Sequence, residues 1–435
     1  MKYIMYLAGV LLCASILNGM TLDEAIELAK ARSLAQKGPQ LEKLRTRGQL
    51  HEAWSNALPQ IEGSVGYQRA LKKGKIFFPN PENGEVMPFE LDQNNALSAG
   101  VTLNQPLFTF GRVAAGLRGA RAANRATEHA IQQQNRQTEL DVMQRFWGVL
   151  MLRDVVKARE LSLAVSDSSL RRAERMRELG LLSDYDVLRV RVQAQNQRPA
   201  LDRARNELAL AELSLKEYLG IPIDTSLAFD GTLDQFEVTI DTIAGTKRLS
   251  DRDDLNALRD MATAQQNLYV IYKNARFPVL AGQMRYQWQW QNNDWDIAPR
   301  NNYSALYAGV ALSIPIWSSG AVHGKALQSK ADWRKAEWML AQAERGARLQ
   351  YESALRDLET SLENERAALL AVELAEQARK IAQTKFSQGQ ITTLEMDAAQ
   401  LDELTARVGL ADATFRRLTA SAELRMALGQ SPHGN

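Results

Sequence analysis

Few residues of this chain have the types and spacings that covalent or metal chemistry requires. The 435 residues include one cysteine, Cys13, and four histidines, none of which stands in an H-x-x-x-H or H-E-x-x-H pattern that would hold a metal ion. The sequence also has no Ser/His/Asp arrangement and no G-x-x-x-x-G-K-S/T loop for nucleotide phosphates. We therefore predict no enzyme activity, no ATP hydrolysis, no cofactor and no bound metal.

The charge balance argues against nucleic acid as a partner. Lysine and arginine number 53 against 51 aspartates and glutamates, so the formal net charge is only +2. A protein that wraps nucleic acid needs an excess of cations to neutralise phosphates, and this composition does not supply one. Because 24% of the residues are charged, we expect most of the protein to face water.

Residues 1–20 have the pattern of an export signal. Lys2 precedes an apolar run over residues 3–17, which is shorter than the roughly 20 residues that a membrane-spanning helix needs. Lipidation of Cys13 is the alternative, but the bulky Leu12 stands where a lipoprotein signal has a small residue. We therefore expect an unlipidated signal. No later stretch is long and apolar enough to span a membrane as a helix.

The rest of the chain is a duplicated unit. Residues 96–111 match residues 305–320, and Gly180 matches Gly389, at a constant offset of 209 residues. Upstream of Gln68 the offset is 219, so the two halves differ by ten residues between positions 68 and 95. Solenoid repeats are about 20–50 residues long, whereas this period has the size of a domain. Such repetition is typical of a tube or ring of similar segments rather than of an enzyme with one active site.

Each half contains a pair of predicted strands, at about 60–105 and about 279–314. Apolar residues alternate with small polar ones, which is typical of transmembrane β-barrel strands but also of a half-buried soluble hairpin. The export signal favours the membrane, as do the aromatic residues near the hairpin ends, namely Tyr67, Tyr286, Trp288 and Trp290. The segments 68–95 and 287–304 have the composition of exposed loops.

Four strands cannot close a barrel, because bacterial single-chain barrels have at least eight. An open sheet in lipid would leave the hydrogen-bonding groups of its edge strands unsatisfied. We therefore expect the chain to pool strands with copies of itself. Two copies give eight strands, which fill their own lumen with side chains, and three copies give twelve, which leave a channel.

A long helix and a return helix follow each strand pair. The long segments 112–179 and 321–388 contain no proline, and each would extend about 100 Å as a helix. The first carries two adjacent apolar stripes, which suit a helix with a neighbour on each side, as in a closed ring. The alternative is an ordinary bundle helix. The stripes are Leu140, Met143, Trp147 and Leu150, and Val142, Phe146, Val149 and Val156.

The return helices are predicted at 184–218 and 393–427. Gly180 and Gly389 suit the C-terminal caps of the long helices, and Ser183 and Thr392 suit the first residues of the return helices. The resulting organisation is an export signal at 1–20, a first repeat at 21–222, a connector at 223–250 and a second repeat at 251–435. The connector contains a short extended candidate at 227–229, and the first repeat begins with an amphipathic helix at 22–35.

Four short motifs occur in order on this duplicated frame. They are Thr-Leu-Asp-Glu-Ala at 21–25, Asn-Gln-Pro-Leu-Phe at 104–108 with Gly111 after it, Gly180 with Asp186, and Arg-Asp-Asp-Leu at 252–255. The ordered set resembles the TolC-type outer-membrane efflux protein (outer membrane factor) family over the whole mature chain. The resemblance implies a mainly α fold with a β-barrel portion. Four transmembrane strands per chain would complete a trimeric twelve-stranded barrel, continued by a long coiled-coil α-helical tunnel in the periplasm.

The same resemblance implies a function and partners. The homotrimer would sit in outer-membrane lipid as a passive exit duct of a tripartite efflux or type I secretion system. It would dock on a periplasmic adaptor (membrane fusion) protein and an inner-membrane pump or ABC transporter, which chooses the cargo. The alternative is a non-conducting periplasmic coiled-coil scaffold whose hairpins are soluble. The resemblance also places the adaptor contacts at the two glycine turns, at Gly180, Leu181, Ser183, Gly389, Gln390 and Thr392.

Residues near these turns match the family's periplasmic gate only in part. Glu395 falls on the first position of an acidic ring, whereas Ala398 falls on the second and Asp397 stands beside it. Carboxylates at a narrow mouth would favour cations, but they could equally supply negative charge to the first turn of the return helix. Asp186 matches an acidic latch residue.

Two further positions depart from the family's latch. Ile391 stands where the latch has its arginine, and Phe386 lacks the hydroxyl that the family has there. The family's way of holding the closed state is therefore not expected to operate here unchanged.

Overall fold

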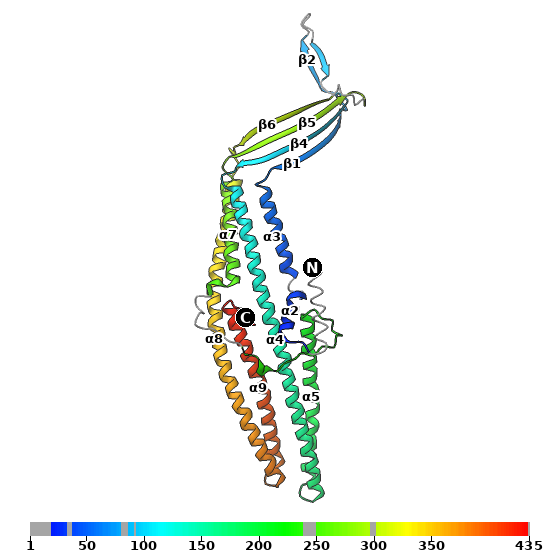
Figure 1. Ribbon diagram of the computed structural model, residues 1–435, viewed down its shortest axis with the longest axis vertical. Helices are drawn as coiled ribbons and strands as arrows, with labels where there is room; N and C mark the ends of the chain where they lie inside the picture. The colour runs from blue at the N-terminus through cyan, green and yellow to red at the C-terminus, as the bar shows by residue number, and fades with distance from the viewer. Residues whose placement is uncertain are drawn as a thin grey trace. The chain divides into compact units, whose positions relative to one another are not determined.

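The computed structural model describes residues 19–32, 37–79, 86–90, 93–237, 249–295 and 302–433. Most of the predicted export signal, including Cys13, lies outside these residues. The chain divides into two compact units (Figure 1). The helical unit comprises Met1–Glu42, Thr127–Ala257 and Leu340–Asn435, and the sheet unit comprises Lys43–Ala126 and Leu258–Met339.

The sheet unit is built on four antiparallel strands. These are β1 (Gln60–Arg69), β4 (Asn95–Phe108), β5 (Val279–Asn292) and β6 (Asn302–Ser313), in the spatial order β1-β4-β5-β6. The two halves of the duplication meet where β4 pairs with β5. The edge strands β1 and β6 have no strand partner on their outer sides among the described residues.

The register keeps the predicted alternation across the whole sheet. Residues Gly63, Val101, Tyr286 and Leu306 form one cross-strand row, and the next row contains Glu62, Thr102, Arg285 and Tyr307. Among the described residues, much of the apolar face is exposed, since Val65 is 80% and Val310 is 68% exposed, although Trp290 at one end of the face is buried. A half-buried soluble hairpin would cover that face, so the burial agrees better with strands that face lipid.

The predicted loop at 68–95 contains a hairpin of its own. Strand β2 (Lys75–Pro79) pairs with β3 (Val86–Glu90) in a separate two-stranded sheet. The second half has only nine residues, 293–301, between β5 and β6. The sequence does not indicate this hairpin, because its strands are short, carry prolines and lack a long alternating pattern.

Helices in the sheet unit connect directly to the strands. They are α3 (Lys37–Ser55), the start of α4 (Arg112–Glu178), α7 (Asp253–Asn274) and the start of α8 (Ala321–Ser387). The turn before α4 has φ values of 49° at Phe110 and 80° at Gly111, and the turn before α8 repeats them with 49° at Ser319 and 82° at Gly320. The duplication is therefore visible in the backbone as well as in the sequence.

The helical unit contains the remainder of α4 and α8 together with α2 (Leu22–Arg32), α5 (Asp184–Tyr218) and α9 (Thr393–Ala427). Helices α4 and α8 both have 67 residues, and α5 and α9 both have 35. The described helices include none that is both long enough and apolar enough to cross a bilayer.

The two apolar stripes of α4 form the core of the helical unit. Phe146 and Trp147 are fully buried in a cluster with residues of α2, α5 and α9. Phe146 also packs edge-on against Phe229 of the connector, with ring centres 5.9 Å apart. The helix has neighbours on several sides, as predicted, but they belong to its own chain. The residues of both stripes are therefore buried within this chain, as in an ordinary core helix.

The connector is tied to the start of the described chain. Met20 and Phe229 form a parallel bridge, in which Met20 N–H donates to Ala228 O at 2.8 Å and Asp230 N–H donates to Met20 O at 2.9 Å. Two short 3₁₀ helices, Leu233–Gln235 and Leu249–Asp251, follow. Met20, which is expected to end the export signal, is 1% exposed and belongs to the core of the helical unit. Cleavage after Met20 would remove both hydrogen bonds.

Candidate functional site at the helical hairpin turns

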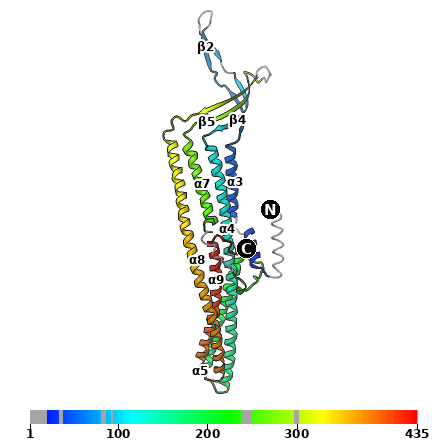
Figure 2. The same cartoon turned by 60° about the vertical axis from the view of Figure 1, so that its left-hand side comes forward.

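The turns that join α4 to α5 and α8 to α9 lie at the same end of the helical unit (Figure 2). Each long helix ends in the same motif, since Leu181 N–H donates to Met176 O at 2.8 Å and Gln390 N–H donates to Lys385 O at 2.9 Å. Gly180 and Gly389 have φ values of 72° and 70°, a conformation that residues with a Cβ rarely adopt.

The first turn presents apolar side chains. Leu179, Leu181 and Tyr185 are all more than two-thirds exposed. Asp186, the predicted latch residue, is engaged within its own turn, because the Ser183 hydroxyl donates to Asp186 Oδ2 at 2.5 Å and accepts from Asp186 N–H at 3.2 Å. The structure thus shows Asp186 as part of the cap of α5.

The second turn holds Glu395 in a capping box. Thr392 N–H donates to Glu395 Oε2 at 2.7 Å, and the Thr392 hydroxyl donates to the same oxygen at 2.9 Å. Glu395 N–H returns a bond to Thr392 Oγ1 at 3.3 Å. These donors hold the pKa of the exposed Glu395 carboxyl below its usual value. Glu395 therefore supplies negative charge to the first turn of the return helix, which was one of the two roles expected for it. The same bonds fix an ionised carboxylate at the turn.

Asp397 and Phe386 are less accessible than Glu395. Asp397 is half-buried, and desolvation raises the pKa of its carboxyl, an effect that the positive charge of Arg189 on α5 partly offsets. Phe386 is only 4% exposed, so its ring packs inside the unit beneath the turn. Of the four predicted gate residues, Glu395 is exposed, Asp186 and Asp397 are partly covered and Phe386 is buried.

A buried polar link joins the two hairpins and was not foreseen from the sequence. Gln400 of α9 donates from Nε2 to Ser169 Oγ at 3.0 Å and accepts from Ser166 Oγ at 3.4 Å, both on α4. Gln400 is 7% exposed. It lies between Met396 and Leu404 at helical spacing. A glutamine on an otherwise apolar stripe is the sequence feature that could have indicated this link.

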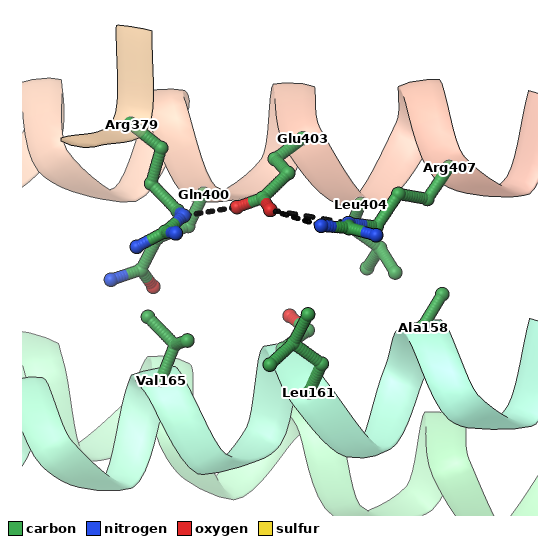
Figure 3. Close-up of a pocket in the computed structure, with 9 residues that line it drawn as sticks. Ala158, Leu161, Val165, Arg379, Gln400, Glu403, Leu404 and Arg407 are labelled. Atoms are coloured by element: carbon green, nitrogen blue, oxygen red, sulfur yellow. Dashed lines mark hydrogen bonds and ion pairs between the residues drawn. The ribbon is translucent and has the colours of Figure 1, made fainter. Parts of the chain in front are cut away.

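A charged cluster lies one turn further along α9. Figure 3 shows Glu403 between the guanidinium groups of Arg379 and Arg407, across from Ala158, Leu161 and Val165 of α4. The Glu403 side chain is 6% exposed, and Arg407 lies 3.0 Å from it and 2.6 Å from Glu376. Arg379 Nε contacts Glu403 directly. Two cations and two anions leave this interior without net charge, as a buried ionic cluster requires.

This arrangement suits binding and movement rather than bond chemistry. In the part of the chain that the structure describes, no group of three or more His, Cys, Asp or Glu side chains could hold a metal ion. The polar interior residues Gln400 and Glu403 fix one relative register of the helices, because a shift would leave their buried groups unpaired.

Comparison with known proteins settles the family. A family model described as outer membrane efflux protein matches residues 22–221 and 246–430, which is most of the chain. The chain belongs to the outer membrane efflux protein family. The curated outer membrane efflux protein BepC of Brucella suis is 23% identical over 450 residues, covering 97% of this chain and 89% of that protein.

Solved structures share the fold. The outer membrane protein VceC of Vibrio cholerae has a TM-score of 0.80 at 17% identity, covering 94% of this chain and 96% of that one. The CmeC outer membrane channel of Campylobacter jejuni has a TM-score of 0.79 at 17% identity, covering 94% and 85%.

Several expectations from the sequence are thereby confirmed. They are the family, the mainly helical fold with a β portion, the outer-membrane location and the role as an exit duct for efflux. The family is one of transport proteins rather than enzymes.

Proposed function

We propose that three copies of this chain form one passive duct that crosses the outer membrane and extends into the periplasm. The observation that carries the proposal is the open four-stranded sheet of the sheet unit. Its edge strands β1 and β6 are exposed along nearly their whole length, and much of its apolar face is exposed. Strand edges in lipid must be paired, and twelve strands, unlike eight, leave an open lumen.

The experiment that tests this proposal combines native mass spectrometry of the detergent-solubilised protein with single-channel recording in planar bilayers. A duct gives the mass of three chains and discrete conductance steps. The non-conducting periplasmic scaffold predicts a protein that stays soluble after lysis and inserts no channels, and such a result would replace the duct with the scaffold.

The two hairpin turns are proposed as the periplasmic mouth and its docking points. The exposed Leu181 and the backbone shape set by Gly180 form one contact point for the adaptor, with Ser183 beside them. Gly389, Gln390 and Thr392 form the other. A cysteine placed at Leu181 or Gln390 should cross-link to the adaptor, whereas one at Lys157, exposed on α4, should not.

Glu395 and Asp397 are proposed to make the mouth selective for cations. Three copies would bring three ionised Glu395 carboxylates together, because the capping box keeps each one charged and fixed in place. Replacing both residues with alanine should reduce cation selectivity in the planar bilayer. Unchanged reversal potentials would remove Glu395 and Asp397 from the gate.

The closed state is proposed to be held by Gln400 with Ser166 and Ser169, in place of the family's latch. These bonds join α4 to α9 inside one chain, so the two hairpins cannot separate without exposing or unpairing buried polar groups. Asp186, in the cap of α5, and Phe386, buried beneath the second turn, are proposed as further gate residues. An adaptor and an inner-membrane pump or ABC transporter would supply the energy to break it. Both drug or metal efflux and type I secretion fit this geometry, because the pump selects the cargo.

A further inference from the structure

A pocket of about 440 Å³ lies in the sheet unit, where the last turns of α7 approach the first turns of α8. Four basic side chains line it: Lys273, Arg276, His323 and Lys330. Neither aspartate nor glutamate is among its lining residues. The pocket therefore gathers positive charge in one concave place, although the whole chain is almost neutral.

The charges of this pocket have no ion-pair partner in the part of the chain that the structure describes. Among the described residues, no carboxylate forms an ion pair with Lys273, Arg276, His323 or Lys330. Elsewhere in the sheet unit arginines are paired, as Arg125 is with Asp260 at 2.6 Å. Like charges held together repel one another, so a bound anion would stabilise the pocket.

Aromatic rings hold two of these cations in place. Lys273 Nζ lies 5.9 Å from the ring centre of Tyr269, and the Arg276 guanidinium lies 5.0 Å from that of Phe277. Such contacts orient a cation without neutralising it. The first turn of α8 also lines the pocket, so the positive end of a 67-residue helix adds to the potential.

The duplication shows that the scaffold does not require three of these four basic residues, because only the position of Lys330 is also basic in the first copy. At the offset of 209 residues, His323 corresponds to Ala114 and Lys330 to Arg121, and at the offset of 219 Lys273 corresponds to Trp54. In that first copy Arg121 lies over the Trp54 ring at 5.3 Å. The basic pocket is thus a feature of the second repeat alone, on a backbone that both repeats share.

The surroundings of the pocket identify the class of anion. The segment between β6 and α8 presents Ile316, 92% exposed, and Trp317, 84% exposed, directly before the pocket residue Ser318. This segment is where the strands give way to helices, which in an outer-membrane duct is the level of the lipid headgroups. Exposed aromatic and aliphatic side chains beside lysine and arginine are typical of protein surfaces at that level.

We propose that this pocket binds the phosphate of an anionic phospholipid, with the acyl chains lying against Ile316 and Trp317. The inference relies on the outer-membrane location and on the proposed placement of the sheet in lipid, but not on the gate. A lipid held here would fasten α7 to α8 at the base of the sheet.

The test uses the full-length, delipidated protein and native mass spectrometry with three probes. The probes are a short-chain phosphatidylglycerol below its critical micelle concentration, the phosphatidylcholine of equal chain length, and inorganic phosphate. Phosphatidylglycerol should bind in preference to phosphatidylcholine. The double variant Lys273→Gln/Lys330→Gln should weaken its binding by about 30-fold, if each cation contributes about 1 kcal/mol.

A matched control removes the same charge from the same unit. Lys325→Gln/Lys335→Gln changes two lysines of α8 that do not line the pocket, so this variant should bind phosphatidylglycerol as the parent protein does. Equal binding by both double variants, or equal binding of the two lipids by the parent, would overturn the proposal. Inorganic phosphate binding as tightly as the lipid would show a site for free anions instead. Conductance is recorded in parallel. If lipid does not bind while the conductance steps are intact, the lipid proposal fails and the duct proposal stands.

Discussion

The two helical hairpins, α4–α5 and α8–α9, are built from helices of matching lengths and have the same motif at the ends of their long helices. The interiors of the two hairpins nevertheless differ. At the offset of 209 residues, the buried pair Arg379 and Glu403 corresponds to Leu170 and Ala194.

The pair Glu365 and Arg417, 2.6 Å apart, likewise corresponds to Val156 and Leu208, which pack in an apolar cluster. One ion pair is present in both hairpins, as Asp167 with Arg198 at 3.9 Å and Glu376 with Arg407 at 2.6 Å.

One helical hairpin backbone therefore accommodates two kinds of interior, one apolar and one ionic. Apolar pairs tolerate small shifts between helices, because van der Waals contacts are individually weak and non-directional. Buried ion pairs add little net stability, but they penalise any arrangement that leaves one partner unpaired. We infer that the second hairpin is held in a defined register and that movement of its helices requires several polar contacts to be broken together.

The largest expected effect comes from breaking the ionic interior of the second hairpin. Glu403→Gln leaves Arg379 buried beside a neutral group, so the free energy of unfolding should fall by about 3–5 kcal/mol, measured by urea denaturation followed by circular dichroism. The double variant Arg379→Leu/Glu403→Ala, which installs the residues of the first hairpin, should recover most of the loss. A double variant as unstable as the single one would contradict the comparison.

The matched change in the first hairpin should do much less. Asp167→Asn removes the partner of Arg198, but both side chains are substantially exposed, so the cost should be below about 1 kcal/mol. A cost equal to that of Glu403→Gln would show that burial does not distinguish the two hairpins.

The link between the hairpins should give the next largest effect. Gln400→Ala leaves the Ser166 and Ser169 hydroxyls without their partner, which should cost about 1–3 kcal/mol and raise the open probability in single-channel recordings. Gln377→Ala is the control, because Gln377 is exposed and bonds to Glu373 of its own helix. If Gln400→Ala channels gate like the parent, these bonds do not hold the closed state.

The caps of the return helices should give a smaller effect. Thr392→Ala and Ser183→Ala each remove one helix cap, at about 1 kcal/mol. Thr392→Ala should also release Glu395, because of these two caps only that of α9 has the reciprocal bonds of a full capping box. Amide hydrogen exchange in the first turns of α5 and α9 would measure the fraying. Faster exchange in α5 than in α9 after the paired substitutions would contradict this ranking.

The smallest effect is expected from pH. The pKa of Glu395 is lowered, so its stabilising contribution is present above the unfolded value and is lost as pH falls through the folded value. The pKa of Asp397 is raised, so its ionisation costs stability at neutral pH, and acidification through its folded pKa relieves that cost.

Reversal potentials in two variants would separate these carboxylates. In Asp397→Asn, Glu395 is the one of these two carboxylates that still titrates. Its pKa is lowered, so cation selectivity should be lost only at a pH below the ordinary glutamate value of 4.5. In Glu395→Gln, Asp397 still titrates with a raised pKa, so cation selectivity should already be lost at a pH above the ordinary aspartate value of 3.8. If cation selectivity is lost at the ordinary pKa values in both variants, the surroundings of Glu395 and Asp397 do not affect selectivity.

The backbone could be predicted largely from the sequence because the duplication repeats the strands of the main sheet and the long helices. The glycines at 180 and 389 mark the helix ends in both copies, and period-two alternation marks all four strands of the main sheet. The β2–β3 hairpin lies in the one segment where the halves differ in length, so no second copy exposed it.

The interior contacts were less predictable. Arg379 and Glu403 are 24 positions apart on different helices, and charged residues on helices usually face water. Nothing local indicates that their side chains meet in the interior. Gln400 gave a signal, a polar residue on an apolar stripe, but its partners lie on α4, more than 200 residues earlier. Helical periodicity identifies faces but not which faces meet.

The central claim is that an open sheet of four strands becomes a channel only when copies of the chain share it. The most direct measurement is the mass of the channel-forming species, obtained by native mass spectrometry on the same detergent fraction that gives conductance steps in planar bilayers. The account predicts three chains and stepwise conductance. A monomeric species, or a trimer that inserts no channels, would contradict it.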